Sequence, residues 1–291
     1  MLHWLTTYKN IFCDAQVWTK VDFLEDCRDA KRHSMSGILG VNFLTIKEYL
    51  PAITGFGKVT VIAHSENKGA IGNEDALIEY VYSEGYDRFI FTEDDNEFSP
   101  NFLEYMNRGL DKYEDEPKVY SISGYNFPID MGNYDKNVYG SFRFSAWGCG
   151  FWKKKRLVIT RKELIKFLLT PSHLLKILVK LPFKFLIVPV MLSRHELYGD
   201  SCYELYCCVN NWVSIFPTVS KVRNWGRDGS GLHGQTDETD PCYNQSIDEA
   251  DTFEYDDIKI ENLKLKSLNK YFSNIYSRAI RLKAEKLEFW K

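Results

Sequence analysis

Three consecutive carboxylates, Glu93, Asp94 and Asp95, end the apolar stretch "FIFT" at residues 89–92. Like charges this close repel one another, so they belong to a solvated loop, to a catalytic pair or to a cation site. Adjacent strand residues point to opposite faces, so at least one acid must act from the following turn. Mg²⁺ or Mn²⁺ often takes only one or two protein carboxylates when phosphate oxygens complete its coordination, which points to a nucleoside diphosphate.

Strand and helix patterns alternate around these acids. Gly85 closes a helix that Asn73 caps, and Ser99 with Pro100 begins the next helix. Further helices are expected at residues 43–54 and 199–210, and strands at residues 9–15, 58–64, 87–95, 118–124 and 212–217. The alternation predicts an α/β fold with a mostly parallel sheet flanked by helices. Ligands of such sheets bind beyond the carboxyl ends of strands, where the three acids lie.

Composition narrows the class of protein. The chain of 291 residues is 44% hydrophobic and 15% aromatic, as in a folded globule, and its net charge of −3 argues against nucleic-acid binding. No CxxC pairs occur among the seven cysteines, so neither a zinc site nor a disulfide framework is expected. Free thiols and the lack of a signal-peptide pattern predict a cytoplasmic protein.

One segment is strongly basic. Lys176, Lys180 and Lys184 lie at helical spacing among apolar residues, and Pro182 and Pro189 argue against a spanning helix. The segment either lies on an anionic membrane at its inner face or packs in the core with snorkelling lysines. Between Phe151 and His195 there is one acid, Glu163, against eleven basic residues: Lys153, Lys154, Lys155, Arg156, Arg161, Lys162, Lys166, Lys176, Lys180, Lys184 and Arg194.

Several motifs follow one another in a distinctive order. After "FTEDDNEFSPNFLEYMNRGL" come "ISGY", "FSAWGCGFWKKK", "DSCYELYCCVNNWVSIFP" and "WGRDGSGLHG". In these motifs the chain resembles bacterial polysaccharide glycosyltransferases of the GT-A fold, in the glycosyltransferase family 2-like group. The last motif is also similar to one in animal N-acetylglucosaminyltransferase I. The resemblance covers about residues 9–235 and implies transfer of a sugar from a nucleotide donor, which we expect to be UDP-linked, with inversion at the sugar carbon.

The resemblance also implies roles for the acids. Asp95 would bind Mn²⁺ or Mg²⁺ at the donor diphosphate, Asp94 would hydrogen-bond the ribose or sugar, and Glu93 would support the turn or contact the sugar. Asp200 would be the catalytic base and Glu204 the second choice, unless both are ordinary acids at a helix start. Further donor contacts would come from Asp14, Asn67, Lys68, Trp147, Gly148, Arg227 and His233.

Alternatives stay open for several of these residues. Trp147 can stack on a sugar or pack in the core, and Gly148 would allow close approach. Arg227 and His233 can belong to a loop that closes over the donor or to a solvated loop.

The chain also departs from the family pattern. The family's opening "FTYxRPEH" element has no match, so the first strand–helix unit is expected to be missing from a glycosyltransferase domain over residues 1–245. Residues 246–291 are expected to form a charged helical extension.

Two functions are consistent with this pattern: an enzyme acting on a saccharide or lipid-linked saccharide acceptor in surface polysaccharide synthesis, or an inactive relative that serves as a binding or scaffold module. A metal-dependent phosphotransferase or nuclease has no supporting phosphate loop.

Overall fold

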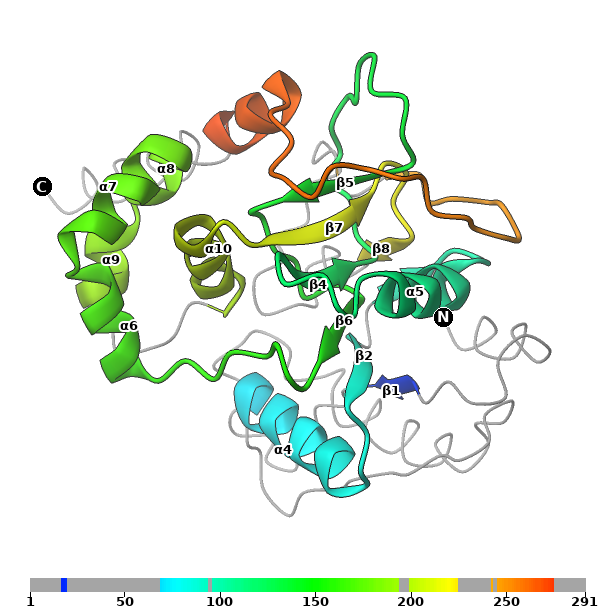
Figure 1. The fold of residues 1–291 in the computed structure, drawn as a ribbon, viewed down its shortest axis with the longest axis horizontal. Coiled ribbons are helices and arrows are strands. Elements are labelled where there is room, and N and C mark those ends of the chain that lie inside the picture. The colour runs from blue at the N-terminus through cyan, green and yellow to red at the C-terminus, as the bar shows by residue number, and fades with distance from the viewer. Residues whose placement is uncertain are drawn as a thin grey trace, which may run out of the picture.

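The structure of the protein is a computed structural model that describes residues 17–19, 69–93, 96–193, 199–224, 242 and 245–274. The strands expected at residues 9–15 and 58–64 and the helix expected at 43–54 lie outside these residues. Figure 1 shows a central sheet with helices around it, so the expected α/β class is confirmed.

Six strands form the main sheet in the order β1-β2-β6-β4-β7-β5. Their bounds are β1 Val17–Thr19, β2 Arg88–Thr92, β4 Val119–Ser123, β5 Val138–Ser141, β6 Cys149–Trp152 and β7 Val213–Pro217. The pairs β1–β2 and β4–β7 are parallel, whereas β2–β6, β4–β6 and β5–β7 are antiparallel. The expectation of a mostly parallel sheet is therefore wrong.

The antiparallel strands β5 and β6 come from residues 125–152, a stretch rich in glycine and aromatic residues for which no strands were expected. Each has only four residues, all of them buried. A strand buried on both faces lacks the alternation of apolar and polar residues that reveals a strand in sequence. Strand β6 inserts between β2 and β4, so two neighbours expected to be parallel are separated by an antiparallel strand.

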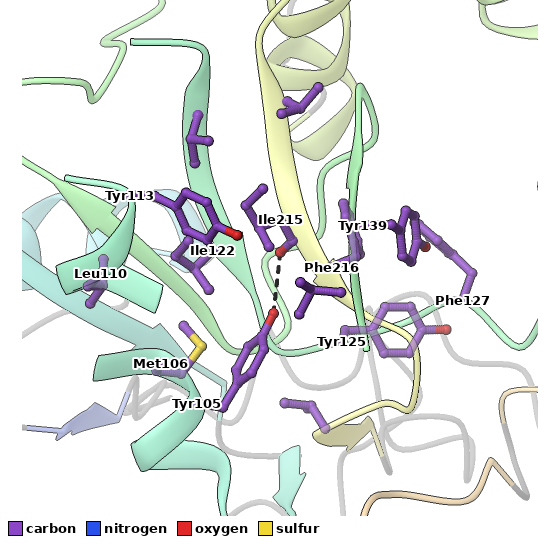
Figure 2. Packing of buried hydrophobic residues seen from close by; sticks show 14 of the residues in the cluster. Tyr105, Met106, Leu110, Tyr113, Ile122, Tyr125, Phe127, Tyr139, Ile215 and Phe216 are labelled. Atoms are coloured by element: carbon purple, nitrogen blue, oxygen red, sulfur yellow. Dashed lines mark hydrogen bonds between the residues drawn. The ribbon is translucent and has the colours of Figure 1, made fainter. Parts of the chain in front are cut away.

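One face of the sheet packs against α5 (Phe102–Lys112). Ile90, Ile122 and Ile215 belong to the same buried cluster as Met106 and several aromatic residues (Figure 2). The hydroxyl of Tyr105 on α5 donates to the carbonyl oxygens of Ser123 at 2.9 Å and Ile215 at 3.5 Å, so the helix is tied to β4 and β7.

The N-cap of α5 is Asn101 rather than the predicted Ser99, and the Asn101 side chain does not cap the helix. Its Nδ2 atom donates instead to the carboxylate of Asp248 and the carbonyl oxygen of Thr252, both at 3.1 Å. The helix therefore begins two residues later than predicted, and the side chain at its cap position binds the C-terminal part of the chain.

The opposite face of the sheet packs against α4 (Gly69–Ser83) and α10 (Gly199–Asn210). Phe89, Phe91 and Tyr120 form a second buried cluster with residues of both helices. Gly85 follows α4 with a φ of 88°, in agreement with its predicted role at the helix end.

Four short helices lie beyond α10 as seen from the sheet (Figure 1). They are α6 Arg161–Leu168, α7 Pro171–Lys180, α8 Pro182–Phe185 and α9 Val188–Ser193. They share a third buried cluster with α10, centred on Leu164, Leu168 and Ile177. Among the residues described, no helix has the length and apolar character needed to cross a bilayer.

Residues 245–274 run along the domain and end in a helix over 266–274 (Figure 1). Phe253, Leu268 and Phe272 belong to the same buried cluster as α5 and the sheet. The buried Lys221 also forms an ion pair with Asp248, which is half-buried. The described part of the expected extension, much of it non-helical, thus contributes to the core of the preceding domain.

Candidate functional site

Of the predicted site residues that the structure describes, Glu93, Trp147, Gly148 and Asp200 lie on segments at one edge of the sheet. Cys149, the first residue of β6, pairs with Phe91 near the end of β2 and with Ser123 at the end of β4. The loop before β6 and the segments after β2 and β4 therefore meet at this edge. Gly124, the residue after β4, donates its backbone N–H to the carbonyl oxygen of Gly148 at 2.6 Å.

The acidic stretch leaves the sheet through a tight turn. The backbone N–H of Asn96 donates to the carbonyl oxygen of Glu93 at 3.2 Å. Glu93 is half-buried and directly follows β2. The two aspartates between Glu93 and Asn96, Asp94 and Asp95, lie outside the described residues.

A small second sheet holds the chain after this turn. Strand β3 (Asn96–Phe98) pairs antiparallel with β8 (Val222–Asn224), and Asn96 lies opposite Asn224. The side chains of these two asparagines also form a hydrogen bond of 3.4 Å. Asn96 directly follows the acids, and Asn224 directly precedes the motif "WGRDGSGLHG". The acids and this motif, both predicted to bind the donor, therefore adjoin two residues that are paired in the second sheet.

Two buried polar atoms that flank the acids have no hydrogen-bond partner among the residues that the structure describes. They are the hydroxyl oxygen of Thr92, whose side chain is inaccessible, and the Nδ2 atom of Asn96, a residue that is 5% exposed. A buried donor left unpaired is costly, so such atoms often serve a ligand. Nδ2 can only donate, which suits a ligand rich in oxygen such as a diphosphate or a sugar.

Asp200 lies in the first turn of α10 and is half-buried. The backbone N–H of Ala146 donates to its carboxylate at 3.3 Å, which joins α10 to the loop before β6. Burial and the nearby charge of Glu204 raise the pKa of the Asp200 carboxyl to about 7. A carboxylate with a pKa near neutrality accepts a proton more readily than an ordinary aspartate does.

Three carboxylates, including that of Asp200, act on the Cys149 thiol at the start of β6. Burial raises the pKa of the Cys149 thiol, and the charges of Glu74, Asp200 and Glu93 raise it further. These three acids come from α4, α10 and the end of β2. The predicted site residues Glu93 and Asp200 thus both act on Cys149, and Glu74, which was not predicted, acts on it too. Within the described part of the chain, no group of three histidine, cysteine, aspartate or glutamate side chains forms a metal site.

Glu204, one turn after Asp200, is buried between two cations. Its Oε2 atom lies 2.5 Å from Nζ of Lys184 and 3.3 Å from a guanidinium nitrogen of Arg143. All three side chains are at most 6% exposed. Both cations already engage the Oε2 atom of Glu204, so the geometry favours Asp200 over Glu204 as a base.

Trp147 and Gly148 lie in the loop that contacts Asp200. Trp147 is half-buried and meets the ring of Tyr125 edge to face, with 4.8 Å between centroids. Gly148 has a φ of 61°, and a Cβ atom there would lie 2.7 Å from the side chain of Val222. Gly148 thus permits the close approach of this loop to β8, and Trp147 packs at the rim of the core.

The remaining predicted residues lie outside the described part of the chain: Asp14, Asn67, Lys68, Asp94, Asp95, Arg227 and His233. Sequence reasoning missed Glu74, Thr92, Asn96 and Arg143. Thr92 and Asn96 adjoin the acids, so their position offered a signal. Arg143 is 61 residues from Glu204, and no local pattern reveals their contact.

Comparison with known proteins finds no family model that matches the chain and no significant match among curated proteins.

Proposed function

We propose that this protein is a glycosyltransferase of the GT-A fold, in the glycosyltransferase family 2-like group, that transfers a sugar from a nucleotide donor, UDP-linked, to an acceptor hydroxyl. The observation that carries the proposal is the convergence of Glu93, the Trp147–Gly148 loop and Asp200 at one edge of the sheet. Their sequence positions match motifs of this enzyme family, and their meeting point is where an α/β sheet binds ligands.

Asp200 is the base in this proposal. Its carboxylate removes the proton from the acceptor hydroxyl as that oxygen forms a bond to the anomeric carbon of the sugar. The bond from this carbon to the diphosphate oxygen breaks, and the nucleoside diphosphate leaves with the electron pair. Attack from the face opposite the leaving group inverts the sugar carbon. Glu204 is already engaged by Lys184 and Arg143, which leaves the role of base to Asp200.

The donor side is assigned to the acids after β2 and to their neighbours. Asp95 would hold a Mn²⁺ or Mg²⁺ ion, which neutralises the charge that develops on the leaving diphosphate. The Nδ2 atom of Asn96 and the hydroxyl of Thr92, which have no hydrogen-bond partner within the described part of the chain, suit donor oxygens. Asp94, Arg227 and His233 would complete the donor contacts, and Asp14, Asn67 and Lys68 would act from the N-terminal part of the chain.

The acceptor is proposed to be a saccharide or a lipid-linked saccharide of surface polysaccharide synthesis, at the cytoplasmic side of the membrane. Trp147 lies in the loop whose Ala146 contacts Asp200, and the exposed part of its ring would offer an apolar surface to the acceptor. An aromatic surface packs well against the apolar face of a sugar ring.

The test measures UDP binding by calorimetry with and without Mn²⁺ for the wild type, Asp95→Ala and Asp130→Ala. Asp130 is exposed and hydrogen-bonds only the nearby Gly132 among the contacts described, so it serves as the control. We expect Mn²⁺ to strengthen binding in the wild type and in the control but not in Asp95→Ala. An affinity for UDP that changes neither with Mn²⁺ nor with the Asp95→Ala substitution would refute the role of Asp95.

A second measurement separates an enzyme from a binding module. Wild-type protein is incubated with UDP-sugars and Mn²⁺, and release of UDP is followed with and without saccharide acceptors. Release that depends on Asp200 supports the transferase. Tight UDP binding without release from any UDP-sugar would favour the inactive module instead.

A further inference from the structure

The helices beyond α10 present apolar side chains to solvent. This region holds five of the seven large exposed apolar side chains in the described part of the chain, and each of the five is between 45% and 71% exposed. We call them the outer apolar face: Leu169, Leu175, Leu178, Val179 and Leu186. Leu175, Leu178 and Val179 share one side of α7, because residues three and four apart lie on the same face of a helix. Leu169 and Leu186 follow the last residues of α6 and α8.

The three lysines at helical spacing point the other way. Nζ of Lys176 donates to the carbonyl oxygen of Val209 at 3.1 Å, and Nζ of Lys180 donates to that of Cys208 at 3.2 Å. Both carbonyls belong to the last turn of α10, where cations interact well with the helix dipole. Lys184 is buried against Glu204. These lysines therefore attach the segment to the domain, and their side chains do not cover the outer apolar face.

The segment that carries this face is rich in basic residues. The sequence holds no aspartate or glutamate between Glu163 and Glu196. Glu163 itself is engaged in the capping box of α6 with Thr160. Lys162 and Lys166 are exposed on α6, and no ion pair is formed by either among the residues described.

We infer that the outer apolar face docks on an anionic lipid bilayer. Its leucine and valine side chains enter the boundary between head groups and acyl chains, and Lys162 and Lys166 lie against lipid phosphates. A second copy of the chain would also cover apolar surface, but it would bring lysines of the same sign together. The inference does not depend on the proposed transferase activity.

The test is co-sedimentation of the full chain with vesicles in the absence of any sugar donor. One set of vesicles contains phosphatidylglycerol and phosphatidylcholine, and the other contains phosphatidylcholine alone. The variants are Leu175→Gln/Val179→Gln and Lys162→Gln/Lys166→Gln. Val219→Gln is the matched control, because Val219 is 50% exposed and lies outside the face.

We expect the wild type and the control to bind the anionic vesicles at least about tenfold more tightly than the neutral ones. Each double variant should lose about tenfold in affinity for the anionic vesicles. Added salt should weaken the wild type more than the lysine variant, because screening acts on the charges.

Equal binding by the wild type and both variants, or no binding by the wild type, would overturn the inference. A concentration-dependent dimer that Leu175→Gln/Val179→Gln abolishes, without vesicle binding, would assign the face to a second copy. If the apolar variant unfolds, as judged by circular dichroism, the lysine variant and the salt dependence still decide the question.

Discussion

Nζ of Lys184 lies 2.5 Å from Oε2 of Glu204 in the interior of the protein. Lys184 is on α8, in the basic segment, and Glu204 is on α10, the helix that carries Asp200. Ser201, on the same helix as Glu204, accepts a further hydrogen bond from Lys184 at 2.8 Å. The pair joins the helices beyond α10 to the candidate site. The basic segment is thus a structural part of the domain as well as the carrier of an exposed apolar face.

Removing the cation of this pair should destabilise the protein. We expect Lys184→Met to lower the free energy of unfolding by about 3 kcal/mol, because Glu204 then loses one of the two cationic partners described for it and keeps Arg143 in a buried position. Chemical denaturation measures the loss, and Lys162→Met, an exposed lysine, serves as the control with an expected change within about 0.5 kcal/mol. Equal losses in both variants would contradict the structural role of the pair.

The pH dependence of transfer tests the role of Asp200. A base must be deprotonated, and burial with the charge of Glu204 raises the pKa of Asp200 to about 7. We therefore expect kcat/KM to rise through about pH 7 and to level off above it. Asp200→Asn should lower kcat by at least about 100-fold and remove this rise. A profile that keeps the same midpoint in the variant would assign the titration to another group.

The same carboxyl should reduce stability at high pH. Its pKa is raised in the folded protein from the ordinary value of 3.8, so folding disfavours the charged form. The penalty is absent below about pH 4, grows up to about pH 7 and is complete above it. Asp200→Asn should stabilise the protein at about pH 8 by on the order of 2 kcal/mol, less than the full shift implies because the residue is partly exposed. At about pH 4 the two proteins should unfold alike.

Much of this architecture follows from local sequence signals. Gly85 marked the end of α4, and the apolar run before Glu93 marked β2, so the acids could be placed at a strand end. Helix α10 was predicted over its full extent, which placed Asp200 in its first turn. Glu93 and Asp200, both chosen from sequence motifs, each influence the Cys149 thiol at the start of β6.

Other features depend on contacts that the sequence does not encode locally. Strands β5 and β6 were not predicted because they are short and buried on both faces. The direction of Lys176 could not be predicted either, since a helix with apolar residues on two sides does not reveal which side meets the domain. Lys176 is directed toward the domain by its hydrogen bond to the carbonyl oxygen of Val209, which lies 33 residues away in the chain.

The loop at the site should depend on Gly148. Its φ of 61° lies in the left-handed region, and an added Cβ would lie 2.7 Å from Val222 and 3.0 Å from Phe102. Gly132 has a φ of 59° but no atom within 4 Å of an added Cβ, so it isolates the backbone cost. We expect Gly132→Ala to cost about 1 kcal/mol and Gly148→Ala clearly more, in chemical denaturation. Equal losses would mean that the loop shifts without cost.

The last prediction concerns the chain after residue 245. Phe253 is 8% exposed, its ring lies edge to face on Tyr105 at 5.0 Å, and Nζ of Lys221 lies 4.2 Å from its ring centroid. Truncating it leaves a cavity against α5 and removes the ring from the buried lysine. We expect Phe253→Ala to lower the free energy of unfolding by about 3 kcal/mol. Val219→Ala, at an exposed position, should change it by less than about 0.5 kcal/mol.

A single cooperative unfolding transition, shifted in Phe253→Ala, is the expected result, because Phe253 packs in the same cluster as the sheet. An independent extension would behave differently: the main transition would stay in place, and only a minor transition would move. Protection of backbone amides in α5 gives a second readout. Faster exchange there in Phe253→Ala, with no change in Val219→Ala, would show that residues 245–274 stabilise the helix after the acidic turn.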